Sequence, residues 1–316
     1  MPVGVTDGEE VPIRDGYGRG LLDIADSHPD VVVLDADLGA STRGAWFGAE
    51  YPDRWFNVGI AEQDMMVIGA GLASTGKTAF AGTFAVFSLR AIEQVRNSIA
   101  RPAADVTVVG SHGGLATGPD GASAQAVEDV AAYRSLPNVR VVSPGDAVET
   151  AAFVEELAET PGPAYLRLVR EPTPVVFDDD HDPSIGEGFV LREGADLTLV
   201  THGAMLSRTL DAAALLADRD VDARVVHMPS IKPLDEALLQ RCARETGRLV
   251  TVEDHSVVGG LGAAVAELVG ESDPVTVERI GVDDTFGESG DPEDLYELHG
   301  LTADAVARDV VDSTQR

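Results

Sequence analysis

The stretch DVTVVGSHGGLATGPDGASAQAVED, residues 105–129, decides the fold class. It begins with a mostly apolar run, Asp105–Ser111, passes through a glycine-rich segment and leads into a helical pattern, Ala124–Ser135. A largely apolar strand is typical of a parallel sheet that is covered on both faces. A glycine-rich loop after such a strand can bring its backbone close to a ligand. The loop matches neither the G-x-G-x-x-G nor the P-loop motif, which argues against both nucleotide-binding classes.

The same alternation of strand and helix extends to both sides of this stretch. Further strands are predicted at Val31–Asp35, Thr78–Gly82, Val139–Ser143 and Ala164–Val169. Further helices are predicted at Glu62–Ser74, Leu89–Ala100 and Asp146–Glu159. Apolar strands that alternate with helices indicate a doubly wound α/β domain over about residues 10–170.

A break in this rhythm separates a second domain. The segment EPTPVVFDDDHDPSIGE, residues 171–187, has three prolines and an acidic cluster, which is typical of a linker. Strands then follow at Leu197–Thr201, Ala223–His227, Leu249–Glu253 and Val275–Ile280, with helices at Ala204–Asp218, Leu234–Thr246, Gly259–Gly270 and Thr302–Asp312. We therefore expect two doubly wound α/β domains, at 1–172 and 189–316, joined by a linker at 173–188.

The charge of the chain is unusual. Asp and Glu number 54 against 23 Lys and Arg, so the formal net charge is −31, and only two lysines occur, Lys77 and Lys232. This excess argues against nucleic acid and anionic membranes as partners. Disorder is the other interpretation of such acidity, but the acids alternate with well-patterned apolar runs. We interpret the surface as one suited to a high-salt cytoplasm, where ions screen crowded like charges.

The sequence also limits location and metal chemistry. No apolar run is long enough to span a membrane, and the first twenty residues lack the apolar core of an export signal, so a cytoplasmic location is expected. The single cysteine, Cys242, excludes an internal disulfide and a cysteine-only metal site.

Several residues with chemical potential fall just beyond predicted strand ends. Each has an ordinary structural explanation: Glu62 suits the first turn of a helix, and Phe84 and Phe87 suit a core. Taken together they are more specific, because ligands of open parallel sheets lie outside the carboxyl ends of the strands. The residues that gather at this edge are Asp37, Ser41, Glu62, Phe84, Phe87, His112 and Asp120.

The order of these motifs resembles a known family. The segments DADLGAS, NVGIAEQ, GTFAVF, SHGGLATGPDG, LPNVRVVSPGD and GPAYLRLVRE follow one another between residues 35 and 171. This order resembles the pyrimidine-binding domain of transketolase, and the region after the linker resembles the C-terminal domain of that family. The whole chain is most similar to the separately encoded C-terminal half of a split transketolase. Deoxyxylulose-phosphate synthase and the β-subunits of ketoacid dehydrogenases are more distant relatives.

The resemblance implies thiamine diphosphate as cofactor. Glu62 would hydrogen-bond the aminopyrimidine ring and so activate the cofactor, while Phe84 and Phe87 would form the slot for this ring, with Phe84 as the preferred stacking partner. Ile60 would lie beneath the bent cofactor and Asp37 near its middle. Arg90 stands near the ring, where several relatives have a tyrosine.

The resemblance also implies a partner chain. The family binds the diphosphate through Mg²⁺ with a GDG motif, which this sequence lacks. An N-terminal subunit carrying the metal ligands is therefore expected, in an α₂β₂ assembly. No metal ligand is assigned to this chain.

The substrates implied by the resemblance are sugar phosphates that exchange a two-carbon unit. His112 would handle hydroxyl protons and Asp120 would bind a substrate hydroxyl. The phosphate group would be bound by Arg14, Ser41 and Arg170. One departure concerns the family motif G-x-D-G-x-[ST]-H-Q, which is GPDGASAQ here, so that Ala124 replaces a second histidine.

Two alternatives remain open at this point. The first is another thiamine enzyme, either ketoacid-dehydrogenase β-like, deoxyxylulose-phosphate-synthase-like or a transketolase-like enzyme for an unusual sugar, and the altered histidine keeps it open. The second is a non-catalytic module that kept the fold, against which the retained Glu62, Phe84 and Phe87 argue.

Overall fold

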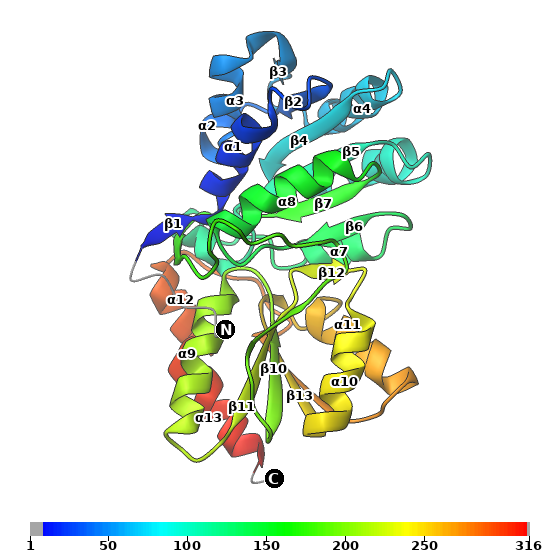
Figure 1. Ribbon diagram of the computed structural model, residues 1–316. Coiled ribbons are helices and arrows are strands. Elements are labelled where there is room, and N and C mark those ends of the chain that lie inside the picture. The colour runs from blue at the N-terminus through cyan, green and yellow to red at the C-terminus, as the bar shows by residue number, and fades with distance from the viewer. Residues whose placement is uncertain (1–8, 315–316) are drawn as a thin grey trace.

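The strands of the first half of the chain form a seven-stranded sheet. A computed structural model describes residues 9–314 of the protein (Figure 1). The sheet has the order β12-β6-β7-β5-β4-β2-β3, parallel except for the edge strand β12. The strands are β2 (Val31–Asp35), β3 (Trp55–Asn57), β4 (Thr78–Phe84), β5 (Val106–Ser111), β6 (Arg140–Val142), β7 (Ala164–Arg167) and β12 (Ser230–Lys232).

Both faces of this sheet are buried, as its apolar strands predict. Val31 and Val33 of β2 belong to one apolar cluster, and the alternate residues Val32 and Leu34 belong to another. The first cluster lies under α1 (Ile13–Ile24), α3 (Gly44–Glu50) and α8 (Ala147–Glu159). The second lies under α4 (Glu62–Ala73), the π-helical turn η3 (Val95–Ala100) and α7 (Asp129–Arg134). This arrangement is a doubly wound α/β layer structure.

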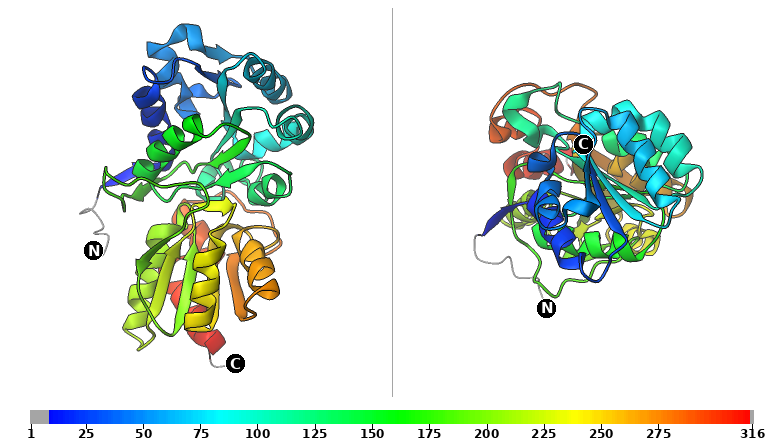
Figure 2. Two further views of the ribbon diagram at one scale, coloured as in Figure 1. Left: turned by 45° about the vertical axis from the view of Figure 1, so that its right-hand side comes forward. Right: turned by 90° about the horizontal axis from the view of Figure 1, so that it is seen from above.

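A second sheet of five strands forms the other half of the molecule, below the first in Figure 1 and in the left view of Figure 2. Its order is β14-β13-β10-β11-β9, parallel except for β9. The strands are β9 (Phe189–Arg192), β10 (Leu197–Thr201), β11 (Ala223–His227), β13 (Arg248–Ser256) and β14 (Thr276–Val282). Helices α9 (Met205–Ala217) and α13 (Ala303–Thr314) cover one face, and α10 (Glu236–Thr246) and α11 (Leu261–Glu271) the other. The expectation of two α/β domains with mainly parallel sheets is confirmed.

Two predicted helices differ in the structure. The helix expected at Leu89–Ala100 is a series of short turns, namely η2 (Leu89–Ala91), α6 (Ile92–Gln94) and η3, and it is preceded by the short helix α5 (Ala85–Ser88). The helix expected at Ala124–Ser135 begins only at Asp129. The preceding residues form turns, in which the amides of Ala124 and Gln125 donate to the carbonyl of Gly121. The side-chain amide of Gln125 donates to the carbonyl of Glu288 at 2.9 Å and so holds this segment in place.

The sequence pattern missed α1 entirely. Three of its twelve residues are glycines, Gly16, Gly18 and Gly20, which weaken a helical signal. These glycines allow α1 to pack closely against α8, because a Cβ atom at Gly16 would collide with the carbonyl oxygen of Ala147 at the start of α8. The pattern also missed the short antiparallel pair β1 (Glu10–Pro12) and β8 (Pro172–Pro174). The second strand of this pair lies at the start of the expected linker.

Polar groups are buried where the two halves meet. Arg167 donates to Asp129 at 2.8 Å and to the carbonyl of Asp254 at 2.9 Å, and all three residues are almost inaccessible to solvent. The antiparallel strand β12 comes from the second half of the chain but completes the first sheet. The two halves are thus held by hydrogen bonds as well as by apolar contact. No helix among residues 9–314 combines the length and apolarity needed to cross a bilayer.

Candidate active site

The neighbouring strands β7, β5, β4 and β2 end at one edge of the first sheet. Phe84 ends β4 opposite Ser111, which ends β5, and Gly110 lies opposite Arg167 at the end of β7. The segments that continue from these ends carry most of the predicted site residues. The topology therefore brings together residues that are more than 100 positions apart in the chain, as the strand-end argument predicts.

His112 is a buried polar group at this edge. It is 3 % exposed, has a left-handed backbone with φ 59°, and stacks on Phe84 with ring centroids 3.7 Å apart. Its Nε2 lies 3.2 Å from Nη1 of Arg14, and its Nδ1 lies 2.9 Å from Oγ of Ser111. Because a guanidinium only donates hydrogen bonds, Nε2 must accept, and the proton of the neutral ring is on Nδ1.

The electrostatic surroundings keep this ring neutral. Burial lowers the pKa of His112, and the positive charges of Arg14, Arg170 and Arg43 lower it further, to about 3. At neutral pH the imidazole therefore presents a lone pair at Nε2. It can accept a proton there, and Arg14 limits how well the ring can hold that proton.

The predicted anion-binding residues surround His112. Arg14 donates from Nη1 to the carbonyl of Ser41 at 3.1 Å as well as to the histidine. Arg170 approaches Asp120 at 3.5 Å and donates to the carbonyl of Thr117 at 3.3 Å. Arg170 also lies close enough to lower the pKa of Arg14 and of His112. The five predicted substrate residues thus form one group.

Glu62 forms a second group. It is the first residue of α4, and its side chain is only 3 % exposed. Its carboxylate pairs with Nη1 of Arg90 at 3.4 Å. A small cavity of about 220 Å³ opens here, lined by both residues and by Ile60, which is 77 % exposed. A buried carboxylate that lines an open cavity can bind a ligand that enters this cavity.

An aromatic segment runs between the two groups. The rings of Phe84 and Phe87 are stacked with centroids 5.4 Å apart and planes within 7°. Phe84 is also stacked by His112, while Arg90, three residues after Phe87, reaches Glu62. Residues 84–90 therefore connect the His112 group with the Glu62 group along one side of the site.

Asp37 lies beside the loop that precedes Glu62. Its backbone is left-handed with φ 65°, and its Oδ1 accepts a hydrogen bond from Nδ2 of Asn57 at 3.2 Å. Asn57 in turn accepts from the amide of Gly59, so Asp37 is tied to the turn that leads into α4. Asp37 is exposed and remains available to a ligand.

Three residues near the site were not singled out from sequence. Arg43 pairs with Asp15 at 2.6 Å and contributes to the low pKa of His112. Gln125 holds the glycine-rich loop, and its place in the motif GPDGASAQ was a usable signal. Asp254 accepts from the amide of Leu115 in the same loop at 2.9 Å. It comes from the second sheet, 139 positions away, and no local pattern marks it.

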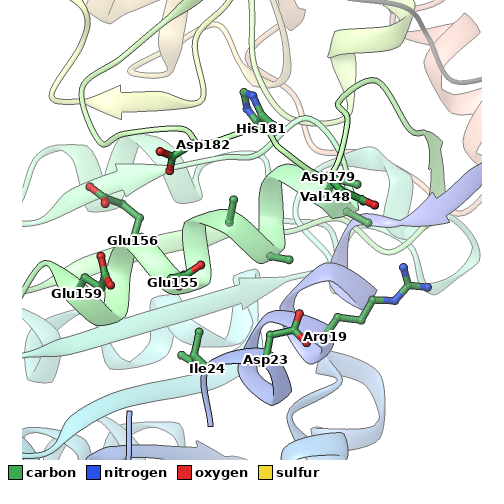
Figure 3. Close-up of a pocket in the computed structure, with 13 residues that line it drawn as sticks. Arg19, Asp23, Ile24, Val148, Glu155, Glu156, Glu159, Asp179, His181 and Asp182 are labelled. Atoms are coloured by element: carbon green, nitrogen blue, oxygen red, sulfur yellow. The ribbon is translucent and has the colours of Figure 1, made fainter. Parts of the chain in front are cut away.

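Two further observations show what lies outside the site. Among residues 9–314, no group of three or more His, Cys, Asp or Glu side chains is placed to hold a metal ion. The larger cavity of about 550 Å³ in Figure 3 lies between α1, α8 and the segment 179–182. Its walls are acidic, with Glu155, Glu156 and Glu159 on α8, and no predicted site residue lines it.

Comparisons with known proteins agree over the full length of the chain. The family description "Transketolase, pyrimidine binding domain" matches residues 9–175, and "Transketolase, C-terminal domain" matches residues 186–306. A putative transketolase C-terminal section from Methanocaldococcus jannaschii is 39 % identical, covering 96 % of each chain. A 6-deoxy-6-sulfo-D-fructose transketolase subunit from a Clostridium species is 38 % identical, covering 98 % of this chain and 96 % of that one. A solved structure described as the inactive β4 tetramer of a split-gene transketolase has a TM-score of 0.88 at 44 % identity, covering 96 % of this chain and 98 % of that chain.

Proposed function

This chain belongs to the transketolase family, and from that premise we propose that it is the C-terminal subunit of a two-chain, thiamine-diphosphate-dependent transketolase. The observation that carries the proposal is the buried carboxylate of Glu62 in an open cavity, with the stacked rings of Phe84 and Phe87 at the same carboxyl edge of a parallel sheet. The matched C-terminal section has the length of this chain, as expected for a separately encoded half.

The residues present fit the aminopyrimidine part of the cofactor. When bound, thiamine diphosphate supplies a carbanion that can attack a carbonyl group. Glu62 would hydrogen-bond the ring nitrogen opposite the exocyclic amine and share its proton, and Ile60 and Asp37 would border the ring from the loop before α4. We assign the diphosphate and its Mg²⁺ to the partner subunit, because this sequence lacks the GDG motif through which the family binds them.

The stacking geometry favours Phe87 over Phe84 as the ring that meets the cofactor. Phe84 is covered by His112 and by Phe87 and is 9 % exposed. Phe87 is only half-buried and keeps more free surface. We therefore assign Phe84 to holding Phe87 and His112 in place, and Phe87 to direct stacking.

The substrate side of the site fits a phosphorylated ketose. Arg14 and Arg170 supply guanidinium groups for a phosphate, with Ser41 beside Arg14. Asp120 would accept from a substrate hydroxyl, and the Nε2 lone pair of His112 would accept its proton during transfer of a two-carbon unit. Arg14 must then release Nε2, because both cannot donate to one lone pair.

An apolar surface around α4 supports a partner chain. Phe56, Ile60, Val67 and Ile68 are all large, apolar and at least 39 % exposed, and they lie on β3, α4 or the loop between them. We propose that the N-terminal subunit covers this surface in an α₂β₂ assembly and completes the cofactor site at the Glu62 cavity. The β4 tetramer of the split-gene relative is described as inactive, in keeping with a chain that needs its partner.

A second candidate is a transketolase for an unusual sugar. One relative is named for 6-deoxy-6-sulfo-D-fructose and another for apulose 4-phosphate. Where the family motif has its second histidine, this chain has Ala124, which is buried at 8 % exposure. The polar groups that meet the substrate therefore differ from those of the family motif.

Co-expression with a chain that carries the GDG motif tests the proposal. The assembled pair should bind thiamine diphosphate with Mg²⁺ and transfer two-carbon units from xylulose 5-phosphate, whereas this chain alone should do neither. Isothermal titration and a ketol-transfer assay in molar KCl measure the two properties. Micromolar binding and turnover by the isolated chain would overturn the two-chain proposal.

A further inference from the structure

We propose that Arg90 guards the Glu62 carboxylate and must leave it before the aminopyrimidine ring can bind. This inference rests on the proposed function and assigns Arg90 a positioning role that neither the motif nor the fold predicts. In residues 9–314, Arg90 provides the hydrogen bond that the carboxylate of Glu62 receives, from Nη1 to Oε2 at 3.4 Å.

The two partners differ sharply in exposure. The Glu62 side chain is 3 % exposed, whereas that of Arg90 is 60 % exposed. The guanidinium therefore covers the carboxylate from the solvent side. When the pair breaks, Arg90 can be hydrated in place, but Glu62 needs a new partner, since a buried carboxylate without one is costly.

Arg90 and the cofactor compete for the same group. The guanidinium of Arg90 only donates hydrogen bonds, and it lies on the solvent side of the Glu62 carboxylate. A ring that reaches Glu62 through the cavity meets this guanidinium first, because Arg90 lines the same cavity and is far more exposed than the carboxylate. Binding of the ring therefore includes moving Arg90 aside and breaking the ion pair.

The surroundings allow Arg90 to move without a change of backbone. The cavity of about 220 Å³ lies directly beside both side chains. Gln63, the next residue of α4, donates from Nε2 to the carbonyl of Arg90 at 3.2 Å and so holds its main chain. The side chain can swing into solvent while η2 and α4 stay in place.

Arg90→Gln in the assembled two-chain enzyme tests this role. Removing the pair should tighten binding of thiamine diphosphate by about two- to fivefold, which is the range expected for a partly exposed ion pair. Isothermal titration with Mg²⁺ present measures the dissociation constant. Arg96→Gln is the matched control, because Arg96 is an exposed arginine of the following turn that bonds Asn97 and should leave the constant unchanged.

A second variant separates this role from a merely structural one. In a Glu62→Gln background, Arg90→Gln should change the dissociation constant by less than about 1.5-fold, because the ion pair is already absent. Unchanged or weaker cofactor binding in Arg90→Gln alone would overturn the inference, as would an equal effect in both backgrounds. Failure of the wild-type pair to bind the cofactor would instead overturn the proposed function and this inference together.

Discussion

Arg14 donates a hydrogen bond to Nε2 of His112 across 3.2 Å, although the two residues are 98 positions apart. This contact determines the tautomer of the histidine, because it leaves Nδ1 as the protonated nitrogen facing Ser111. Together with burial it also keeps the ring uncharged at the pH of the cell. The proposed substrate base thus begins in the form that accepts a proton.

The low pKa of His112 predicts a pH-dependent cost to stability. An unfolded histidine titrates near pH 6.5, whereas the folded ring titrates near pH 3, so between these values the unfolded state binds more protons. His112 should therefore lower the free energy of unfolding as the pH falls through this window, by about 2 kcal/mol at pH 5.

His112→Gln tests this cost, since glutamine does not titrate. The variant should lose stability relative to wild type at pH 8, and that loss should shrink by about 2 kcal/mol at pH 5. Denaturant unfolding in molar KCl at both pH values measures the difference. An equal loss at pH 8 and pH 5 would mean that folding leaves the pKa of the His112 ring at its ordinary value.

Glu62→Gln should remove cofactor activation. The amide cannot share a proton with the ring nitrogen, so exchange of the C2 proton of the bound cofactor should slow by more than about 100-fold. NMR exchange measurements on the assembled enzyme follow this step directly. Glu236→Gln, at the exposed first position of helix α10, is the matched control and should leave the exchange rate unchanged. If both variants behaved alike, Glu62 would be only a helix-terminus carboxylate.

Ala124→His tests whether the site binds its sugar substrate as proposed. A histidine donor at this position should leave kcat/KM for xylulose 5-phosphate equal or raise it, because a missing hydrogen bond to a buried group costs about 1–3 kcal/mol. Ala122→His, on an exposed residue of the same loop, serves as the control. A large fall in the Ala124 variant alone, with a fast wild type, would show that the pocket is built around alanine and that the proposed arrangement of substrate contacts is wrong.

Glu149 predicts a second pH effect, away from the site. Its buried carboxylate is shared by His227 of β11 at 2.7 Å and His181 at 3.2 Å. Burial alone would raise the pKa of Glu149, but the charge of His227 and the hydrogen bonds from both histidines and the Gly145 amide lower it to about 2. The carboxylate therefore stabilises the fold above its ordinary pKa of 4.5, and this stabilisation is lost as the pH falls toward 2.

Glu149→Gln should cost about 3–5 kcal/mol of unfolding free energy at pH 7, because the amide keeps one acceptor oxygen where the carboxylate has two and carries no charge to meet His227. The difference from wild type should narrow between pH 4.5 and pH 2. Glu155→Gln, on an exposed residue of the same helix, should change stability by less than about 0.5 kcal/mol. If the difference in unfolding free energy between Glu149→Gln and wild type stayed constant across this pH range, the charge of Glu149 would not be the source of the stabilisation.

The net charge of −31 predicts that folding and assembly need high salt. The Debye length grows from about 3 Å at 1 M to about 30 Å at 0.01 M, so dilution exposes the acidic surface to its own repulsion. Circular dichroism and thermal unfolding should show a loss of structure below molar KCl. Equal melting temperatures at low and high KCl would remove the high-salt interpretation.

The agreement between sequence and structure is greatest where a pattern is local. The strands Val31–Asp35, Leu197–Thr201 and Ala223–His227 have the predicted bounds, because a run of apolar residues reports directly that both faces of a strand are buried. The position of Glu62 in the first turn of α4 follows in the same way. The helix predicted from Ala124 instead begins at Asp129, and the segment before it is held by a hydrogen bond from the side chain of Gln125 to the distant carbonyl of Glu288.

By itself, then, the sequence determined the layer architecture, the edge of the sheet at which the site lies and the residue types that gather there. Only the tertiary structure decided which of them touch. Arg14 reaches His112 from a helix that no pattern predicted, Arg90 covers Glu62, and Asp254 holds the glycine-rich loop from the other sheet. The physical reason is that hydrophobic periodicity describes burial over a few residues, whereas a hydrogen bond depends on the order in which distant strands assemble and on the direction of each side chain.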